Sequence, residues 1–147
     1  MPGICGIVAS SLSTQELGQA IAAMQQRMEP ADWQVLCQWA GTSQAVGVGL
    51  GSVALAETAQ RHPRLAVDPS GQQALILDGE LFETEKLAAA LSAGGRPVSA
   101  DDHAGLLLAG CQQQGASFLR RVQGSFAAAW WDGAAGRLTL MTDRLGT

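Results

Sequence analysis

The chain alternates between stretches in which every second residue is apolar and stretches in which apolar residues recur every three or four positions. The second pattern runs from Leu17 to Met28, directly after Ser13-Thr14-Gln15-Glu16, which has the form of a helix-capping box. It predicts an amphipathic helix over residues 14–28 that is ended by Pro30.

Two more helices are expected in the second half of the chain. One begins at a Thr84 cap and ends at Gly94-Gly95, and the next runs from residue 101 or 102 to Gly115. The remaining patterned stretches predict strands over residues 4–9, 33–39, 45–56, 64–68, 73–77, 125–131 and 137–142.

Turn sequences connect several of these strands. Pro69-Ser70-Gly71 and Asp132-Gly133 each separate two apolar stretches and predict β-hairpins, and Gly41-Thr42-Ser43 predicts a turn before a Gly-spaced strand. Strands therefore come in hairpin groups with helices between the groups, which is typical of an α+β domain with mainly antiparallel sheets. A chain of 147 residues has the length of one such domain.

The composition narrows the classes of function. The formal net charge is −4 and basic residues gather only in pairs such as Arg120-Arg121, so neither nucleic acid nor a membrane is expected as a partner. No apolar run is long enough to span a membrane, and no signal peptide is visible. Cys5, Cys37 and Cys111 are odd in number and widely spaced, which argues against a metal site or disulfides and favours a cytoplasmic location.

Four short motifs carry a resemblance to a known family. They are Cys5-Gly6-Ile7, Asp78-Gly79-Glu80, the run Gln123-Gly124-Ser125-Phe126-Ala127 that leads to Trp131-Asp132, and Asp143-Arg144-Leu145-Gly146. In this order they resemble the class II glutamine amidotransferase domain of asparagine synthetase and its relatives. That family begins Cys-Gly-Ile, has Asn-Gly-Glu after an apolar strand, and has Gly-Met-Phe-Ala-Phe before Trp-Asp and Asp-Arg-x-Gly.

The resemblance implies the fold of the N-terminal nucleophile (Ntn) hydrolases. This is a four-layer α+β sandwich of two mainly antiparallel sheets with helical outer layers. It would take in residues 1–147 as one domain, C-terminally truncated, because the family's domain continues past Asp-Arg-x-Gly into further strands and then a synthetase domain. ATP and Mg²⁺ are expected only in that C-terminal synthetase domain, so no cofactor is expected here.

The resemblance also implies roles for individual residues. Cys5 matches the family's nucleophile, whose own α-amino group is the base, so activity would require cleavage before Cys5. Gly79 keeps the backbone amide of the oxyanion hole, and Asp78 stands where the family has an Asn. Glu80 and Asp102 are expected at the substrate's amino group, with His103 as the alternative to Asp102.

Two other family segments match less closely. The family holds the glutamine carboxylate with the Arg of a His-x-Arg-Leu segment, and the match proposed here is residues 52–55, with Ala54 in place of that Arg. The Arg-Gly-Pro-Asp signature is reduced to Arg27, Pro30 and Asp32.

The leading hypothesis is a glutaminase domain that releases ammonia from glutamine for ATP-dependent amide formation by a synthetase. One alternative is a degenerate, non-catalytic Ntn-like domain that supports an amide- or lactam-forming enzyme, with Cys5 as an ordinary strand cysteine. Another is a self-assembling binding module, in which open strand edges pair to form a homo-oligomer.

Overall fold

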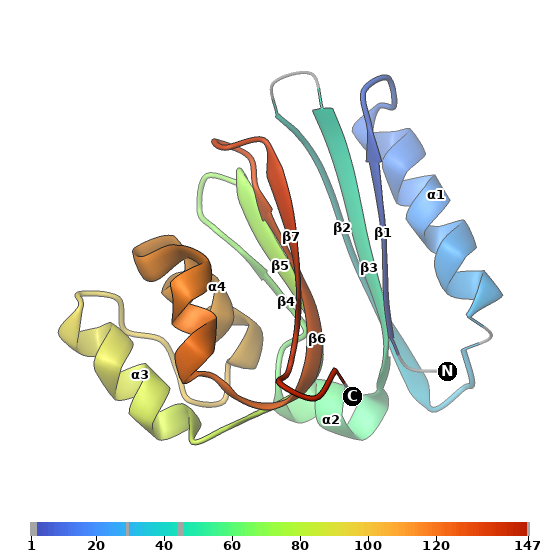
Figure 1. The fold of residues 1–147 in the computed structure, drawn as a ribbon. Helices are drawn as coiled ribbons and strands as arrows, with labels where there is room; N and C mark the ends of the chain where they lie inside the picture. The colour runs from blue at the N-terminus through green and yellow to red at the C-terminus, as the bar shows by residue number, and fades with distance from the viewer. Residues whose placement is uncertain (1–2, 29, 44–45, 147) are drawn as a thin grey trace.

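Two antiparallel sheets stack face to face with helices on their outer sides, as Figure 1 shows for this computed structural model. The structure describes residues 3–28, 30–43 and 46–146. The first sheet has the order β1-β3-β2, with β1 Gly3–Ala9, β2 Gln34–Ser43 and β3 Val46–Leu55. The second has the order β4-β5-β6-β7, with β4 Leu65–Val67, β5 Gln73–Phe82, β6 Gln123–Asp132 and β7 Arg137–Thr142. The predicted layered α+β architecture is confirmed.

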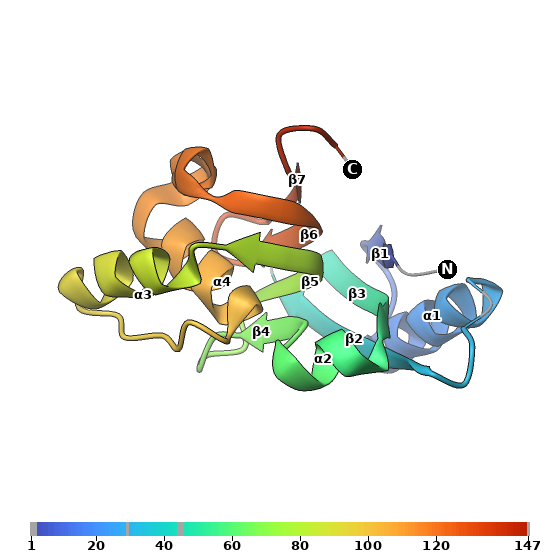
Figure 2. The ribbon, with the colours of Figure 1, turned by 90° about the horizontal axis from the view of Figure 1, so that it is seen from below.

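The helices are divided between the two outer layers. Helix α1 (Thr14–Arg27) covers the first sheet, and α3 (Thr84–Ala93) and α4 (His103–Gln114) lie on the far side of the second sheet (Figure 1). Helix α2 (Ala56–Arg61) follows β3, and a 3₁₀ helix, η1 (Gly115–Arg121), leads from α4 into β6. Figure 2 shows α2 beside β2 and β4 at one end of the sheets. No helix among the described residues has the length and apolarity needed to cross a membrane.

Helix α1 approaches the first sheet closely because β3 has glycines where side chains would face the helix. Its start is the predicted capping box: the Glu16 N–H donates to Ser13 Oγ at 3.3 Å, and the Ser13 N–H donates to Glu16 Oε2 at 2.8 Å. Ile21 is fully buried, and a Cβ added to Gly49 would lie only 2.7 Å from its Cγ1 atom. The Gly-spaced pattern of β3 therefore makes room for the apolar face of α1.

Two apolar clusters hold the layers together. One lies between the sheets and includes Leu50, Ile76 and the fully buried Trp131. The other lies between the second sheet and its helices, where Leu77 and Leu107 are fully buried. Alternate residues of β5 supply the two clusters, because successive strand side chains point to opposite faces.

Several element boundaries differ from the sequence predictions. Gly41–Ser43 was predicted as a turn but continues β2, because these residues pair with Val46–Val48 of β3. The expected strand start at Ala45 lies outside the described residues. Helix α2 was not predicted, and a 3₁₀ helix, η1, follows α4 from Gly115 to Arg121. The Thr84 cap is wrong: the N-cap is Glu83, which has a left-handed backbone and makes no side-chain cap.

The predicted hairpins are present with small changes. Strands β4 and β5 pair around the Pro69-Ser70-Gly71 turn, and β6 and β7 form the antiparallel hairpin predicted at Asp132-Gly133. The β6–β7 connection spans residues 133–136, because Asp132 still pairs with Arg137 and belongs to the strand.

Candidate functional site

The carboxyl end of β5 has an unusual backbone at Gly79. The residues Asp78-Gly79-Glu80 lie inside the strand, paired with Ala127, Phe126 and Ser125 of β6. Gly79 has a φ of 107°, and a Cβ there would overlap the carbonyl oxygen of Ser125. Only glycine fits both the angle and the close approach of β6 at this position of the strand.

A pocket of about 310 Å³ opens beside this segment. It is lined by Leu55, Arg64, Asp78, Gly79, Glu80, Phe82 and Ser125. Arg64 immediately precedes β4 and is 3% exposed, and its Nη1 donates to the carbonyl oxygen of Gly79. Its Nε is buried and has no hydrogen-bond partner in the described part of the chain. The pocket thus combines one buried guanidinium with two carboxylates. The guanidinium still has at least one unused hydrogen-bond donor, at Nε.

Burial and Arg64 act in opposite directions on Asp78. Burial raises the pKa of the Asp78 carboxyl above its usual 3.8, and the positive charge of Arg64 offsets part of that rise. Asp78 lies two residues after Ile76, which packs between the sheets, so the Asp78 side chain is on the inter-sheet face of β5.

A pair of stacked imidazoles stands behind the pocket. The rings of His62 and His103 are 3.9 Å apart between centroids and 12° from parallel. His103 is 4% exposed, and its Nδ1 accepts the Leu81 N–H at 3.2 Å. Burial lowers the pKa of His103 below its usual 6.5; His62 and Arg64 add to the lowering, while Glu80 and Asp101 oppose it. His103 is therefore neutral near pH 7 and fixes the β5 backbone next to Glu80.

A known protein family matches this chain in sequence. The sequence pattern of the glutamine amidotransferase domain matches residues 1–147. The chain belongs to the glutamine amidotransferase domain family. A search of curated proteins found no match. All the lining residues of the pocket lie within the matched range, so the pocket is part of the glutamine amidotransferase domain.

Arg64 is the pocket residue that the sequence interpretation missed. The His-x-Arg-Leu segment was assigned to residues 52–55, but Ala54 is fully buried in β3 and is absent from the lining of the pocket. His62-Pro63-Arg64-Leu65 has the literal His-x-Arg-Leu pattern, and its Arg lies in the pocket of this glutamine amidotransferase domain. The signal was available in the sequence, where Arg64 is the first residue of the strand predicted over residues 64–68 and directly follows His62-Pro63.

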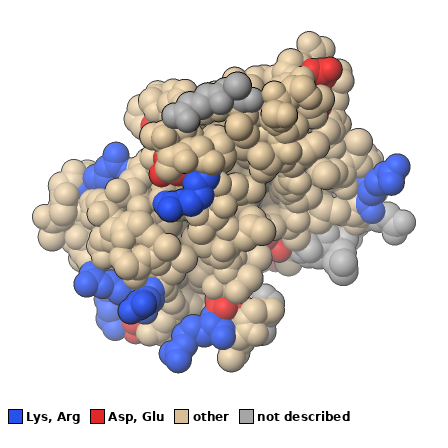
Figure 3. Space-filling view, turned by 45° about the horizontal axis from the view of Figure 1, so that its top comes forward, with Lys and Arg blue, Asp and Glu red and all other residues tan. Residues whose placement is uncertain are grey.

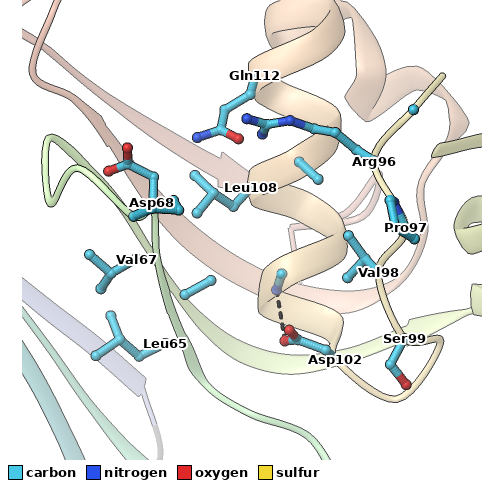
Figure 4. A pocket seen from close by; sticks show the side chains of 15 residues that line it. Leu65, Val67, Asp68, Arg96, Pro97, Val98, Ser99, Asp102, Leu108 and Gln112 are labelled. Carbon is cyan, nitrogen blue, oxygen red and sulfur yellow. Dashed lines mark hydrogen bonds between the residues drawn. The ribbon is translucent and has the colours of Figure 1, made fainter. Parts of the chain in front are cut away.

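Asp102 does not join Glu80 in the pocket as expected. Its Oδ1 accepts the Gly105 N–H at 2.9 Å and caps α4. It lines a different hollow of about 670 Å³ between β4 and α4, where Figure 4 shows it below Val98 and well apart from Arg96 and Gln112. His103 is the first residue of α4 and faces β5, whereas Asp102 is the N-cap, has a non-helical backbone and lines this second hollow. Of the two residues proposed, the domain brings His103 next to Glu80.

Cys5 lies in β1, opposite Gly51 of β3, with its sulfur on the α1 side of the sheet. A Cβ added to Gly51 would lie 3.0 Å from Cys5 Sγ and 2.6 Å from Cγ2 of Ile21. The preceding Ile4 packs against the cluster between the sheets, which agrees with strand alternation. Cys5 is not among the residues that line the Arg64 pocket, and burial raises the pKa of the Cys5 thiol. In this arrangement Cys5 is neither aimed at the pocket nor activated.

Cys5, Cys37 and Cys111 are all free thiols, and burial raises the pKa of Cys111 to about 12. Within residues 3–28, 30–43 and 46–146, no group of three or more His, Cys, Asp or Glu side chains has the geometry to hold a metal ion.

Proposed function

We propose that this domain binds the amino-acid end of glutamine in the Arg64 pocket and hydrolyses its carboxamide once Cys5 is the first residue of the chain. The observation that carries the proposal is the buried Arg64, held against Gly79 between Asp78 and Glu80 in a chain of the glutamine amidotransferase family. The size of the pocket, about 310 Å³, is at the small end of ligand sites and suits a free amino acid.

The charges of the pocket match those of an α-amino acid. A guanidinium pairs with a carboxylate through parallel N–H donors, and the buried Nε of Arg64 has a free donor for such a pair. Glu80 supplies an acceptor for the substrate's ammonium group, the role that the family resemblance gives it. A glutamine held at both groups would present its side-chain amide along the face between the sheets.

The hydrolysis needs Cys5 at the terminus because its α-amine is the base and because cleavage frees the start of β1. The thiol's proton must pass to a base, and an α-amine with a pKa of about 7.7–8.0 can accept it, whereas a peptide nitrogen cannot. The thiolate then attacks the carboxamide carbon, ammonia leaves with the proton from the amine, and water converts the thioester to glutamate. Cleavage would also release Gly3 and Ile4 from their pairing with β3, which leaves Cys5 free to turn its sulfur toward the pocket.

A non-catalytic domain of the same family is the second candidate. It is favoured by the sulfur on the α1 face and by Asp78, which when ionised would repel a developing oxyanion. Such a domain would still bind glutamine through Arg64 but would leave it intact.

An electrophilic glutamine analogue separates the two candidates. It is incubated with the chain that starts at Met1 and with a chain cleaved to start at Cys5, and the adducts are located by mass spectrometry. The proposal expects labelling of Cys5 only in the cleaved chain, with Cys37 and Cys111 as internal controls. No adduct on Cys5 in either chain would favour the non-catalytic candidate.

The wider setting follows the family resemblance. The ammonia would serve an ATP- and Mg²⁺-dependent synthetase of the asparagine synthetase type in the cytoplasm, and three free thiols suit that reducing compartment. For the self-assembling module, the relevant measurement is the molecular mass in solution. A monomer at micromolar concentration would count against a homo-oligomer formed by edge pairing.

A further inference from the structure

Two adjoining hollows lie at the end of β5, and both are walled by Phe82 and Gln123. The larger has a volume of about 530 Å³ and the smaller about 200 Å³. We call the basic and apolar side chains that line them the basic end: Phe82, Lys86, Arg120, Arg121, Arg144 and Leu145. These residues come from β5, α3, η1 and the segment after β7, which the fold brings together at one end of the second sheet (Figure 2).

The basic end has the opposite charge to the chain as a whole. Its hollows contain four basic side chains and two acidic ones, Glu83 and Asp143, in a chain with a formal net charge of −4. Most of the face drawn in Figure 3 is uncharged, and its basic side chains form a few small groups. A local positive excess of this kind attracts an acidic partner.

The acidic residues of the basic end are already occupied within the chain. Glu83 pairs with Lys86 at 2.7 Å. Asp143 accepts the Phe126 N–H at 3.1 Å with one oxygen and the Leu145 N–H at 2.8 Å with the other. Arg120, Arg121 and Arg144 make no ion pair within the part of the chain that the structure describes. Three guanidinium groups are thus left for an external partner.

The apolar side chains of the basic end are exposed next to these charges. Phe82 is 52% exposed, and Leu145 is 86% exposed. The Asp143 hydrogen bonds hold the turn that carries Leu145, so its position is fixed by the fold. Aromatic and arginine side chains side by side are typical of the residues that dominate protein–protein interfaces.

We propose that the basic end is a docking surface for an acidic segment of a partner protein, one that carries apolar side chains among its carboxylates. Carboxylates would pair with the guanidinium groups, and an apolar side chain would pack on Phe82 and Leu145. Phe82 also lines the Arg64 pocket, so the docked segment lies against a wall of that pocket. The docking does not depend on the proposed glutaminase activity, and its test measures binding alone.

The probe is an acetylated, amidated peptide of sequence Glu-Glu-Phe-Glu-Glu-Leu-Glu-Glu, titrated into the full chain with calorimetric detection at low salt. The variant Arg120→Gln/Arg144→Gln should bind at least tenfold more weakly, and Phe82→Ala should also weaken binding. The matched control Arg27→Gln/Arg137→Gln makes the same change in net charge at exposed positions of α1 and β7 and should bind as the parent does. The peptide with Gln for Glu should lose binding, and the peptide with Ser for Phe and Leu should bind more weakly.

Three results would overturn the proposal. These are no binding of the acidic peptide, equal loss in the test and control variants, and tighter binding of an octauridylate RNA than of the peptide. The last would make the basic end a site for phosphates in place of protein carboxylates.

Discussion

The backbone of Gly79 gives the sharpest prediction for stability. Gly79→Ala would place a β-carbon at a φ of 107°, at which an alanine is strained by about 1–3 kcal/mol. The same carbon would overlap the Ser125 carbonyl oxygen and lie 2.7 Å from Cα of Phe126, both backbone atoms that no rotamer change can move. Overpacking of this kind costs about 1–3 kcal/mol more. We expect a loss of roughly 4 kcal/mol, a large part of the roughly 5–15 kcal/mol of a typical domain.

Two other glycines separate the sources of this cost. Gly71 has a φ of 70°, but a Cβ there meets no atom within 4 Å, so Gly71→Ala should cost only the strain, about 1 kcal/mol. Gly18 is helical with open space around it, so Gly18→Ala should stabilise the protein by about 0.5–1 kcal/mol. Urea denaturation with unchanged m values would give the three free energies.

The comparison between Gly79 and Gly71 carries the test. A Gly79→Ala chain that fails to fold while Gly71→Ala folds would agree with the upper end of the expected range. A Gly79→Ala chain that is no less stable than Gly71→Ala would refute the close approach of β5 and β6 at Gly79, and with it the shape of the pocket.

Three further predictions concern the pocket. Arg64→Gln should lower glutamine affinity by about 1.5–3 kcal/mol, measured by calorimetry, because a charge-assisted contact is lost, while Arg61→Gln, an exposed arginine of α2, should have no effect. The pKa of His103 is lower in the folded chain than its usual 6.5, so the unfolded chain binds more protons as the pH drops from 7 toward 5.5. The free energy of unfolding should therefore fall over that range. His103→Asn should flatten this pH dependence, and an unchanged slope in the variant would contradict the role of His103. Asp78→Asn should raise kcat of the chain that starts at Cys5 by about 10²-fold, because the amide restores an oxyanion donor, and an unchanged kcat would exclude Asp78 from that position.

Local signals in the sequence predicted the elements well. The capping box at Ser13 and the turn residues between β4 and β5 act over a few positions, and the structure has both. Thr84 failed as a cap because the N-cap is Glu83, which has a left-handed backbone and makes no side-chain cap. Gly41–Ser43 has turn composition, but pairing with β3 holds it in the strand.

The site was harder to predict because its geometry depends on which face of a strand or helix each side chain occupies. Ile4, Cys5, Ile7 and Val8 are apolar on both sides of β1, so the alternation gave no means of deciding which face the sulfur takes. Only the pairing with β3 and the position of α1 decide it. Likewise, Asp102 and His103 differ by one position at a helix start, and the cap that Asp102 makes turns it away from Glu80.

Glutamate release is the most direct measurement of the central claim, that the Arg64 pocket serves a nucleophile which exists only when Cys5 is the first residue. Glutamine is supplied to the chain that starts at Cys5, to the chain that starts at Met1, and to a chain that starts at residue 5 with Cys5→Ala. The account predicts glutamate from the first chain alone, with release strongly reduced by Arg64→Gln at low glutamine concentration. Equal release by the chains that start at Met1 and Cys5, or none from either, would contradict it.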